Sequence, residues 1–333
     1  MKDTNSTDSP LEAAAGTVGP HVSEAFGLLA DETRLAILLA LWEEYDPHSD
    51  ELVSFSRLFE RVDYDDRGNF NYHLRQISDR FVRKGPGGGY ELLDPGLKLV
   101  QVVVAGIEAG DEAFEPVEID QPCQLCGAPT AVGYRGRHVY WECTGCSGIA
   151  PEGSEMEGFL GAVKLEPAGL VDRTPEEVKA ASRVAVRHRE GSFFDGLCPT
   201  CSGPVDARLD PCTDHDPNGV CEQCRRRFST RAYFQCRVCK DHTSTSPLQL
   251  SLSHPRVVAF IENHGVSTRI TAGDFESNRH VESLQSALLS EEPMKIRSQD
   301  PPRVTVTLSL NGDEISLTFD ETVSVVDVRG CID

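Results

Sequence analysis

The sequence lacks any apolar run close to the roughly 20 residues that a membrane-spanning helix needs. Its first residues also lack the positively charged segment followed by an apolar one that marks a secretory signal. They offer little apolar surface to bury, so we expect residues 1–20 to be a disordered tail. These absences predict a cytoplasmic protein without membrane contact.

The sequence also lacks the motifs that mark common catalytic and cofactor-binding sites. The sequence has no phosphate-binding loop, no dinucleotide fingerprint and no nucleophile beside a plausible base. We therefore do not expect an enzyme. A zinc-dependent enzyme stays open as a weaker alternative, and it would require a zinc held by three protein ligands and a water.

Positive charge is scarce relative to negative charge. The 333 residues include 53 Asp and Glu against 32 Lys and Arg, a net charge of −21, and the acidic residues are dispersed along the chain. This pattern resembles that of haloarchaeal proteins, which keep a hydrated carboxylate surface in multimolar KCl; an ordinary acidic cytosolic protein is the alternative. At about 1 M salt the Debye length is only about 3 Å, so repulsion from a polyanion would be screened.

The length predicts about two domains, or three if some are small, and the pattern predicts an α+β multidomain protein. Apolar residues at helical spacing predict helices within 22–45, 54–62 and 67–80. Two short strands about a glycine-rich turn follow, and then an apolar helix that starts near Pro95. This is the element order of a winged helix-turn-helix domain, which we place at residues 21–110.

The polar side chains of the 67–80 helix suit contact with DNA. Between Arg67 and Lys84 there are five basic residues and one acidic residue, Asp79. Asn and Gln can bond adenine bidentately, Arg can bond guanine, and basic turn residues suit phosphates. We therefore expect double-stranded DNA as a partner, although a domain used for protein contact is the alternative. The expected DNA-contacting residues are Arg67, Asn69, Asn71, Tyr72, His73, Arg75, Gln76, Arg83 and Lys84.

The stretches "LADETRLAILLAL", "FNYHLRQISD" and "GGGYELLDPGLKLV" together resemble the ArsR-like winged-helix regulators, over Val22 to Gly110. The resemblance implies that the 67–80 helix enters the major groove and that Arg83, Lys84 and the glycine turn form the wing. It also implies that the last helix and residues 22–30 pair two subunits into a homodimer. Metal-sensing members carry cysteine pairs in the recognition helix. Here no cysteine precedes Cys123, so metal or redox sensing by this domain is not expected.

Ten of the twelve cysteines form five C-x-x-C pairs, which favours metal binding over disulfides. After an acidic linker at 111–122, two pairs are separated by sixteen residues, the spacing of a zinc ribbon, which we place at 123–170. Four thiolates leave no open coordination position, so the zinc would be structural. The expected ligands are Cys123, Cys126, Cys143 and Cys146.

A connecting helix is expected at 171–192, capped by Thr174, and a second zinc-binding module at 193–245. Its outer pairs, in "CPTCSGP" and "YFQCRVC", echo those of the first ribbon and could form one site around an inserted second site. In the rival pairing, the first pair joins Cys221 and Cys224, which leaves the last pair to Cys212 and His215 or to His242. Either way the chain would hold two or three structural zinc ions. The expected ligands are Cys198, Cys201, Cys212, His215, Cys221, Cys224, Cys236 and Cys239.

Residues 246–333 predict a small α+β domain. A helix is expected over 253–265 with Ser253 as its cap, and Asn311-Gly312 predicts a tight hairpin between alternating strands. The overall order resembles that of uncharacterised haloarchaeal ArsR-like regulators with zinc-ribbon C-terminal regions. Our interpretation is a dimeric, DNA-binding transcription regulator with zinc scaffolding and an unidentified effector. The alternative is a zinc-ribbon interaction factor of the transcription machinery without sequence-specific DNA binding.

Overall fold

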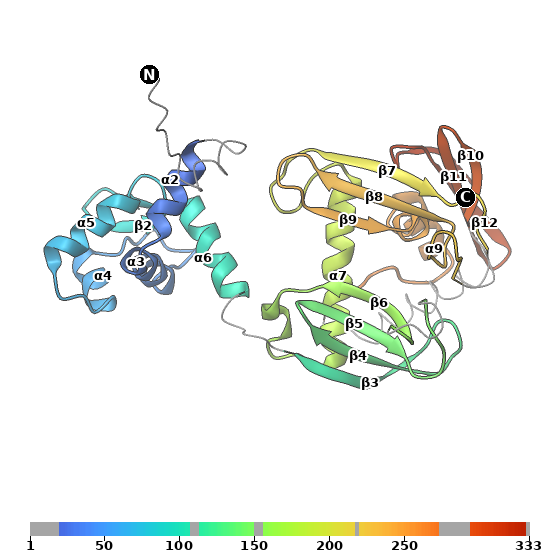
Figure 1. Ribbon diagram of the computed structural model, residues 1–333, viewed down its shortest axis with the longest axis horizontal. Helices are drawn as coiled ribbons and strands as arrows, with labels where there is room; N and C mark the ends of the chain where they lie inside the picture. The colour runs from blue at the N-terminus through green and yellow to red at the C-terminus, as the bar shows by residue number, and fades with distance from the viewer. Residues whose placement is uncertain (1–19, 107–112, 150–155, 217–219, 273–293, 331–333) are drawn as a thin grey trace, which may run out of the picture. The chain divides into compact units, whose positions relative to one another are not determined.

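The computed structural model describes residues 20–106, 113–149, 156–216, 220–272 and 294–330. The chain forms two compact units, residues 1–108 and 109–333 (Figure 1), which we describe one at a time. Both mix helices with small sheets, so the expected α+β class is confirmed. The tail expected at 1–20 lies almost entirely outside the described residues. None of the helices in those residues is long and apolar enough to cross a bilayer.

The first unit consists of helices and one small hairpin. Its described elements are α2 (Pro20–Leu29), α3 (Glu32–Glu43), α4 (Phe55–Arg61), α5 (Arg67–Ile77), β1 (Val82–Lys84), β2 (Tyr90–Leu92) and α6 (Asp94–Gly106). β1 and β2 pair antiparallel across the glycine-rich turn, as the sequence predicted.

Short polar side chains cap the first turns of α3, α4 and α5. Asp31 accepts a hydrogen bond from the Arg34 amide at the start of α3, and Ser54 accepts one from the Arg57 amide at the start of α4. Asp66 caps α5 in the same way. The expected helix over 67–80 is three residues too long, because Ser78 is extended and Asp79 takes a positive φ of 67°.

The core of the first unit lies where α3, α4, α5 and the hairpin meet. Phe70 of α5 is fully buried and packs edge-on against the rings of Phe55 and Phe59. Burial of an aromatic or aliphatic side chain of this size contributes roughly 1.5–3 kcal/mol. The other fully or almost fully buried apolar residues here include Ile37, Leu38, Leu41, Leu58, Leu74, Ile77 and Val82.

The second unit combines three sheets with helices. The first sheet holds β3 (Phe114–Pro122), β4 (Pro129–Arg135), β5 (His138–Cys143) and β6 (Phe159–Lys164); the second holds β7 (Val205–Pro211), β8 (Thr230–Cys236) and β9 (His242–Thr245). The third holds β10 (Met294–Gln299), β11 (Pro302–Leu310), β12 (Asp313–Phe319) and β13 (Val325–Arg329). The helical elements are η1 (Pro167–Leu170), α7 (Pro175–Phe194), α8 (Pro247–Ser251) and α9 (Pro255–Asn263).

The acidic linker expected at 111–122 is wrong over most of its length, because Phe114–Pro122 is β3, the edge strand of the first sheet. β3 pairs antiparallel with β4, from Phe114 opposite Tyr134 to Pro122 opposite Pro129. Its acidic side chains face solvent, while Ile119 and Gln121 are buried. Because β3 ends at Pro122, its pairing with β4 fixes the position of Cys123, the next residue.

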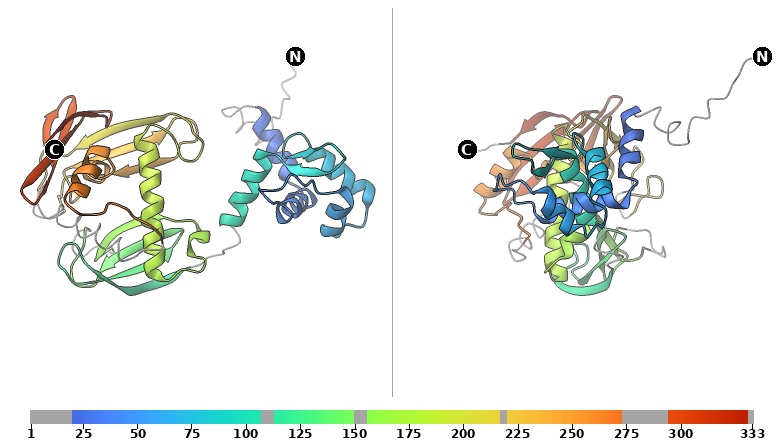
Figure 2. Two further views of the ribbon diagram at one scale, coloured as in Figure 1. Left: turned by 180° about the vertical axis from the view of Figure 1, so that it is seen from behind. Right: turned by 90° about the vertical axis from the view of Figure 1, so that its left-hand side faces the viewer.

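Helix α7 connects the first two sheets of this unit (Figure 2). Thr174 caps it as expected, and the Glu177 side chain accepts a hydrogen bond from the Thr174 amide, which completes a capping box. Near its beginning, Val178 packs into a cluster with Ile119 and Val132 of the first sheet. At its end, Phe193 packs against Phe234 of the second sheet. One helix thus supports both sheets.

The C-terminal part does not form a core of its own. The hairpin at Asn311-Gly312 is present, with both residues at positive φ as a tight turn requires. The expected helix begins after His254 rather than after Ser253, since the His254 ring accepts a hydrogen bond from the Arg256 amide. Side chains from 294–323 share one core with Phe193, with strands β7 and β8 and with helices α8 and α9. The described residues between Phe193 and Val323 therefore share one core.

Candidate metal centres and a polar helix face

The structure brings twelve side chains together in three groups of four, each able to hold a metal ion. Within each group all the candidate ligand atoms lie within 4.8 Å of one another. The groups are Cys123, Cys126, Cys143 and Cys146; Cys198, Cys201, Cys236 and Cys239; and Cys212, His215, Cys221 and Cys224. These are the twelve residues that the sequence predicted as ligands.

The structure also decides between the two pairings of the second cluster. Cys198 Sγ lies 3.6 Å from Cys239 Sγ, and Cys201 Sγ lies 3.5 Å from Cys236 Sγ. The outer pairs therefore form one group, and the rival pairing of Cys198 with Cys221 is wrong. β7 and β8 bring the outer pairs together because they pair from Val205 opposite Cys236 to Pro211 opposite Thr230. The third group, Cys212, His215, Cys221 and Cys224, lies at the other end of this hairpin, beyond Pro211 and Thr230.

The C-x-x-C pairs sit in tight turns, and in most of them backbone amides approach a sulfur atom. The residue after the second cysteine has a positive φ in four of the pairs, at Gly127, Ser202, Arg225 and Lys240. The amides of Gly127, Ser202 and Arg225 each donate to the carbonyl of the first cysteine of their pair, at 2.8–2.9 Å. This turn points amides at sulfur, as at Cys123 Sγ, which accepts from the Leu125 amide at 3.4 Å. Such donors stabilise thiolates.

In the group of Cys212, His215, Cys221 and Cys224, the hydrogen bonding of His215 favours its Nδ1 atom as the metal ligand. The Nε2 atom of His215 lies 3.1 Å from the carbonyl oxygen of Arg227, to which it can donate. That tautomer leaves Nδ1 free as a ligand, and Nδ1 lies 3.5 Å from Cys224 Sγ. A backbone carbonyl behind a ligating histidine is a common arrangement at metal sites because it fixes the ring orientation.

The donor sets fit a closed tetrahedral metal site. Two groups offer four thiolates and the third offers three thiolates and one imidazole, the donors that suit Zn²⁺ in structural sites. Four protein ligands leave no position for a water or a substrate. The arrangement can therefore hold the chain together, and none of the three groups offers an open coordination position for catalysis.

The second feature is the exposed face of α5. Asn71, Tyr72, Arg75 and Gln76 are exposed and lie three or four residues apart, so they share one side of the helix. The opposite side carries the buried Phe70, Leu74 and Ile77. The helix therefore presents amides, a phenol and a guanidinium together.

One expected contact residue does not belong to this face. His73 is only 9% exposed, and its Nδ1 lies 3.2 Å from Asp31 Oδ1, the carboxylate that caps α3. It lies three residues after Phe70 and four before Ile77, on the buried side of α5. The expectation that His73 contacts DNA is therefore corrected: it joins α5 to the start of α3.

The remaining expected contact residues are exposed but differ in their neighbours. Asn69 donates to the Tyr64 hydroxyl, and Arg67 lies over the rings of Phe55 and Phe59. Arg83 forms an ion pair with Glu91 at 2.7 Å, and the Lys84 ammonium lies 5.6 Å from the centre of the Tyr90 ring.

Comparison with known families divides the chain in the same way as the structure. The family described as a domain of unknown function, DUF7351, matches residues 120–325, more than half of the chain. The chain belongs to the DUF7351 family. A second family of unknown function, DUF7347, matches residues 22–103, from α2 to α6. No curated protein matches the chain, and no solved structure matches it. The DUF7351 match begins within β3 and ends in β13, so it contains all three metal groups.

Proposed function

We propose that this protein is a dimeric, DNA-binding transcription regulator whose three metal groups hold structural zinc. In this proposal the first unit is an ArsR-like winged helix-turn-helix domain. α4 and α5 are the helix-turn-helix, and β1, β2 and their glycine turn are the wing. The observation that carries the proposal is the exposed face of α5, on which Asn71, Tyr72, Arg75 and Gln76 lie together.

The dimensions and chemistry of α5 suit the major groove. Its eleven residues span about 16 Å, and the groove is about 12 Å wide, so one face can reach several base pairs. Asn71 and Arg75 are one turn apart, which allows an amide to read adenine while a guanidinium reads a neighbouring guanine. Tyr72 and Gln76 are also one turn apart, and they extend the same face.

The local charge supports the proposal in spite of the acidic composition. Within the part of the chain that the structure describes, Arg75 and Lys84 form no ion pair with a carboxylate, whereas Arg57, Arg61 and Arg80 do. The pair between Arg83 and Glu91 is exposed, and such pairs contribute about 0–1 kcal/mol, so a DNA phosphate can replace the carboxylate.

The zinc part of the proposal rests on the closed donor sets and, for the first group, on the small core beside it. The first sheet encloses only a small apolar cluster around Val132, Tyr134 and Val139. In such small modules, binding of the metal supplies much of the folding free energy.

The test is selection of DNA from a random-sequence pool by the full-length, zinc-loaded protein, at moderate and at multimolar KCl. We expect enrichment of a defined sequence by the wild type. The Asn71→Ala and Arg75→Ala variants should lose selectivity, by about tenfold or more each, because each removes a bidentate base contact worth about 1–3 kcal/mol. Lys98→Ala, on α6 and paired with Asp94, is the matched control and should bind as wild type does.

Equal zinc content and melting temperature of all the variants would show that the losses are local. Absence of any enriched sequence with folded, zinc-loaded wild type would contradict the proposal. It would favour the protein-interaction alternative, in which the same face of α5 contacts another protein.

A further inference from the structure

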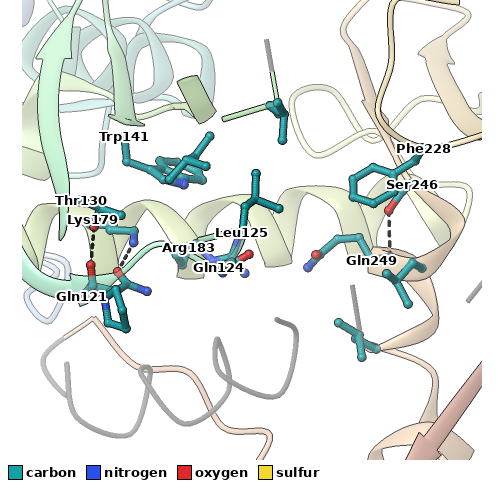
Figure 3. Close-up of a pocket in the computed structure, with 15 residues that line it drawn as sticks. Gln121, Gln124, Leu125, Thr130, Trp141, Lys179, Arg183, Phe228, Ser246 and Gln249 are labelled. Carbon is teal, nitrogen blue, oxygen red and sulfur yellow. Dashed lines mark hydrogen bonds between the residues drawn. The ribbon is translucent and has the colours of Figure 1, made fainter. Parts of the chain in front are cut away.

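The basic side chains of α7 interact with other groups of the second unit. A cavity of about 150 Å³ lies beside this helix, and its lining includes Gln121, Trp141, Lys179 and Phe228 (Figure 3). Lys179 donates a hydrogen bond to Oε1 of Gln121, and its ammonium lies 5.5 Å from the centre of the Trp141 ring. This cation therefore stabilises the packing of α7 against the first sheet.

The outer face of the second sheet, by contrast, presents basic and aromatic side chains to solvent. Residues paired across β7, β8 and β9 point to the same side, so Arg208, Tyr233 and Ser244 form one row. Arg231 lies two residues from Tyr233 along β8 and belongs to the same face. Arg208 and Arg231 are exposed and Tyr233 is half-buried, whereas the opposite face packs into the core through Phe234.

Neutral groups orient the two arginines of this face. The guanidinium carbon of Arg208 lies 4.3 Å from the centre of the Tyr233 ring, so cation–π attraction holds it over that ring. The Nε of Arg231 donates to the Ser244 hydroxyl at 3.1 Å, on the neighbouring strand. Neither partner carries a charge, so both guanidinium groups are positioned and keep their full positive charge.

The turn of the third metal group adds two more arginines beside this face. Arg225 and Arg227 follow Cys224 closely in sequence, and with Arg231 they line a groove of about 460 Å³. Arg225 takes a positive φ of 56°, and its amide donates to the carbonyl of Cys221 at 2.8 Å. The turn that holds candidate metal ligands therefore also fixes where these arginines begin.

The four arginines of the sheet face and the turn are not neutralised by a carboxylate. Their neighbours Arg226 and Arg237 pair with Asp210 and Asp206, but no carboxylate in the described part of the chain forms an ion pair with the four. Glu190 is the only acidic side chain among the described residues that line the groove. In a chain of net charge −21, such a surface favours an anionic partner. We call the following residues the arginine surface: Arg208, Arg225, Arg227, Arg231 and Tyr233.

We propose that the arginine surface binds single-stranded nucleic acid, with phosphates at Arg225, Arg227 and Arg231 and a base stacked on the Arg208–Tyr233 pair. Guanidinium groups bind phosphate oxygens bidentately. The bases of a single strand are open to stacking on aromatic rings and guanidinium planes, whatever the sequence, whereas a duplex keeps its bases inside. The inference does not depend on the proposed reading of duplex DNA by α5.

The test measures the fluorescence anisotropy of a labelled oligo-dT of about 20 nucleotides, which exceeds the about 4–16 nucleotides of common single-strand sites. The full-length, zinc-loaded protein carries Asn71→Ala and Arg75→Ala, so that α5 contributes little, and we expect it to bind the oligo-dT saturably. Adding Arg225→Gln and Arg227→Gln should weaken binding by about tenfold or more. It should also reduce the slope of log K against log salt by about 1.4, because each phosphate contact to a single strand contributes about 0.7.

A substitution of the aromatic residue separates stacking from charge. Tyr233→Leu should weaken binding of the oligo-dT by about fivefold or more and leave the salt slope unchanged, because it removes a stacking surface and no charge. Arg303→Gln, on an exposed arginine of β11 in the third sheet, is the matched control for loss of a positive charge and should bind as its parent does.

Melting temperature and zinc content identify variants that fail to fold. If the variant with both turn substitutions loses zinc, Arg208→Gln decides, because Arg208 lies in β7 outside the metal turns. Failure to bind oligo-dT, or binding that survives these substitutions in folded protein, would overturn the proposal. Tighter binding of poly-glutamate would overturn it in favour of an acidic protein partner. Equal dependence of a duplex on Arg225 and Arg227, with no effect of Tyr233→Leu, would overturn it in favour of duplex DNA.

Discussion

At the scale of single residues, burial changes the pKa of one carboxyl group in α7, that of Glu190. Glu190 of α7 lies where burial raises the pKa of its carboxyl to about 7, although the Thr245 hydroxyl and the charges of Arg183 and Arg231 act in the opposite direction. Since the folded pKa lies above the unfolded value, the folded state binds this proton more tightly. The stability that Glu190 contributes is therefore present at low pH and is lost as the pH rises through about 7.

We predict that Glu190→Gln stabilises the protein more at pH 8 than at pH 6, because glutamine cannot ionise. Thermal unfolding of the zinc-loaded wild type and variant at both pH values measures this difference. Glu176→Gln is the control, since Glu176 lies in the first turn of the same helix. A difference that is constant with pH, or larger at pH 6, would contradict the raised pKa.

Residue patterns explain which parts of the site could be predicted from the sequence. The C-x-x-C turns are local, so the sequence predicted all twelve candidate ligands, although only the register of β7 with β8 settled their grouping. Strand β3 was missed because register shifts interrupt its pairing with β4 after Phe114 and after Ile119 and blur the alternation of its side chains. His73 could have been placed correctly by counting from Phe70 and Ile77. The cavity could not be predicted, because Gln121, Trp141, Lys179 and Phe228 come from four separate segments.

At the scale of elements, α2, α3 and α6 leave large apolar side chains uncovered. Phe26 of α2 is 60% exposed and Val102 of α6 is 67% exposed, while Leu35 and Leu39 of α3 are also exposed. Apolar residues that a monomer leaves in water favour association with a second copy when they are gathered on neighbouring helices. These side chains support the dimer of the proposed function.

We predict that Val102→Glu converts a dimer into a monomer, because the substitution places a charge in an apolar interface. Light scattering after size-exclusion chromatography measures the mass directly. Val326→Glu, at an exposed valine of β13, should leave the mass unchanged and controls for the added charge. A wild type that is monomeric at micromolar concentration would contradict this prediction.

For the whole molecule, the three metal groups lie in one unit only. All of the candidate ligands fall within 123–239, and residues 1–108 contain no cysteine. The first unit has its own core around Phe70 and Leu74, and none of the three metal groups lies in it. Loss of metal should therefore affect the two units differently.

We predict that a strong chelator unfolds the second unit and leaves the first folded. The two tryptophans report on the units separately, since Trp42 lies in α3 and Trp141 in β5. In variants that keep one tryptophan each, chelation should shift the emission of Trp141 to the red and leave that of Trp42 unchanged, and added Zn²⁺ should reverse the shift. Equal shifts of both, or of neither, would contradict the prediction.

Helix α7 also sets an order in which the second unit can form during synthesis. The helix is on the order of 30 Å long, and its beginning packs against strands that precede it in the chain. The partners of its end, including Phe234 and Leu248, are made later. During translation, the first sheet and the beginning of α7 can therefore pack before the partners of the end of α7 have been synthesised. The apolar side chains at that end stay exposed until about fifty more residues are made, which takes roughly 3–10 s. Any chaperone that attends this protein in the cell has that interval in which to act.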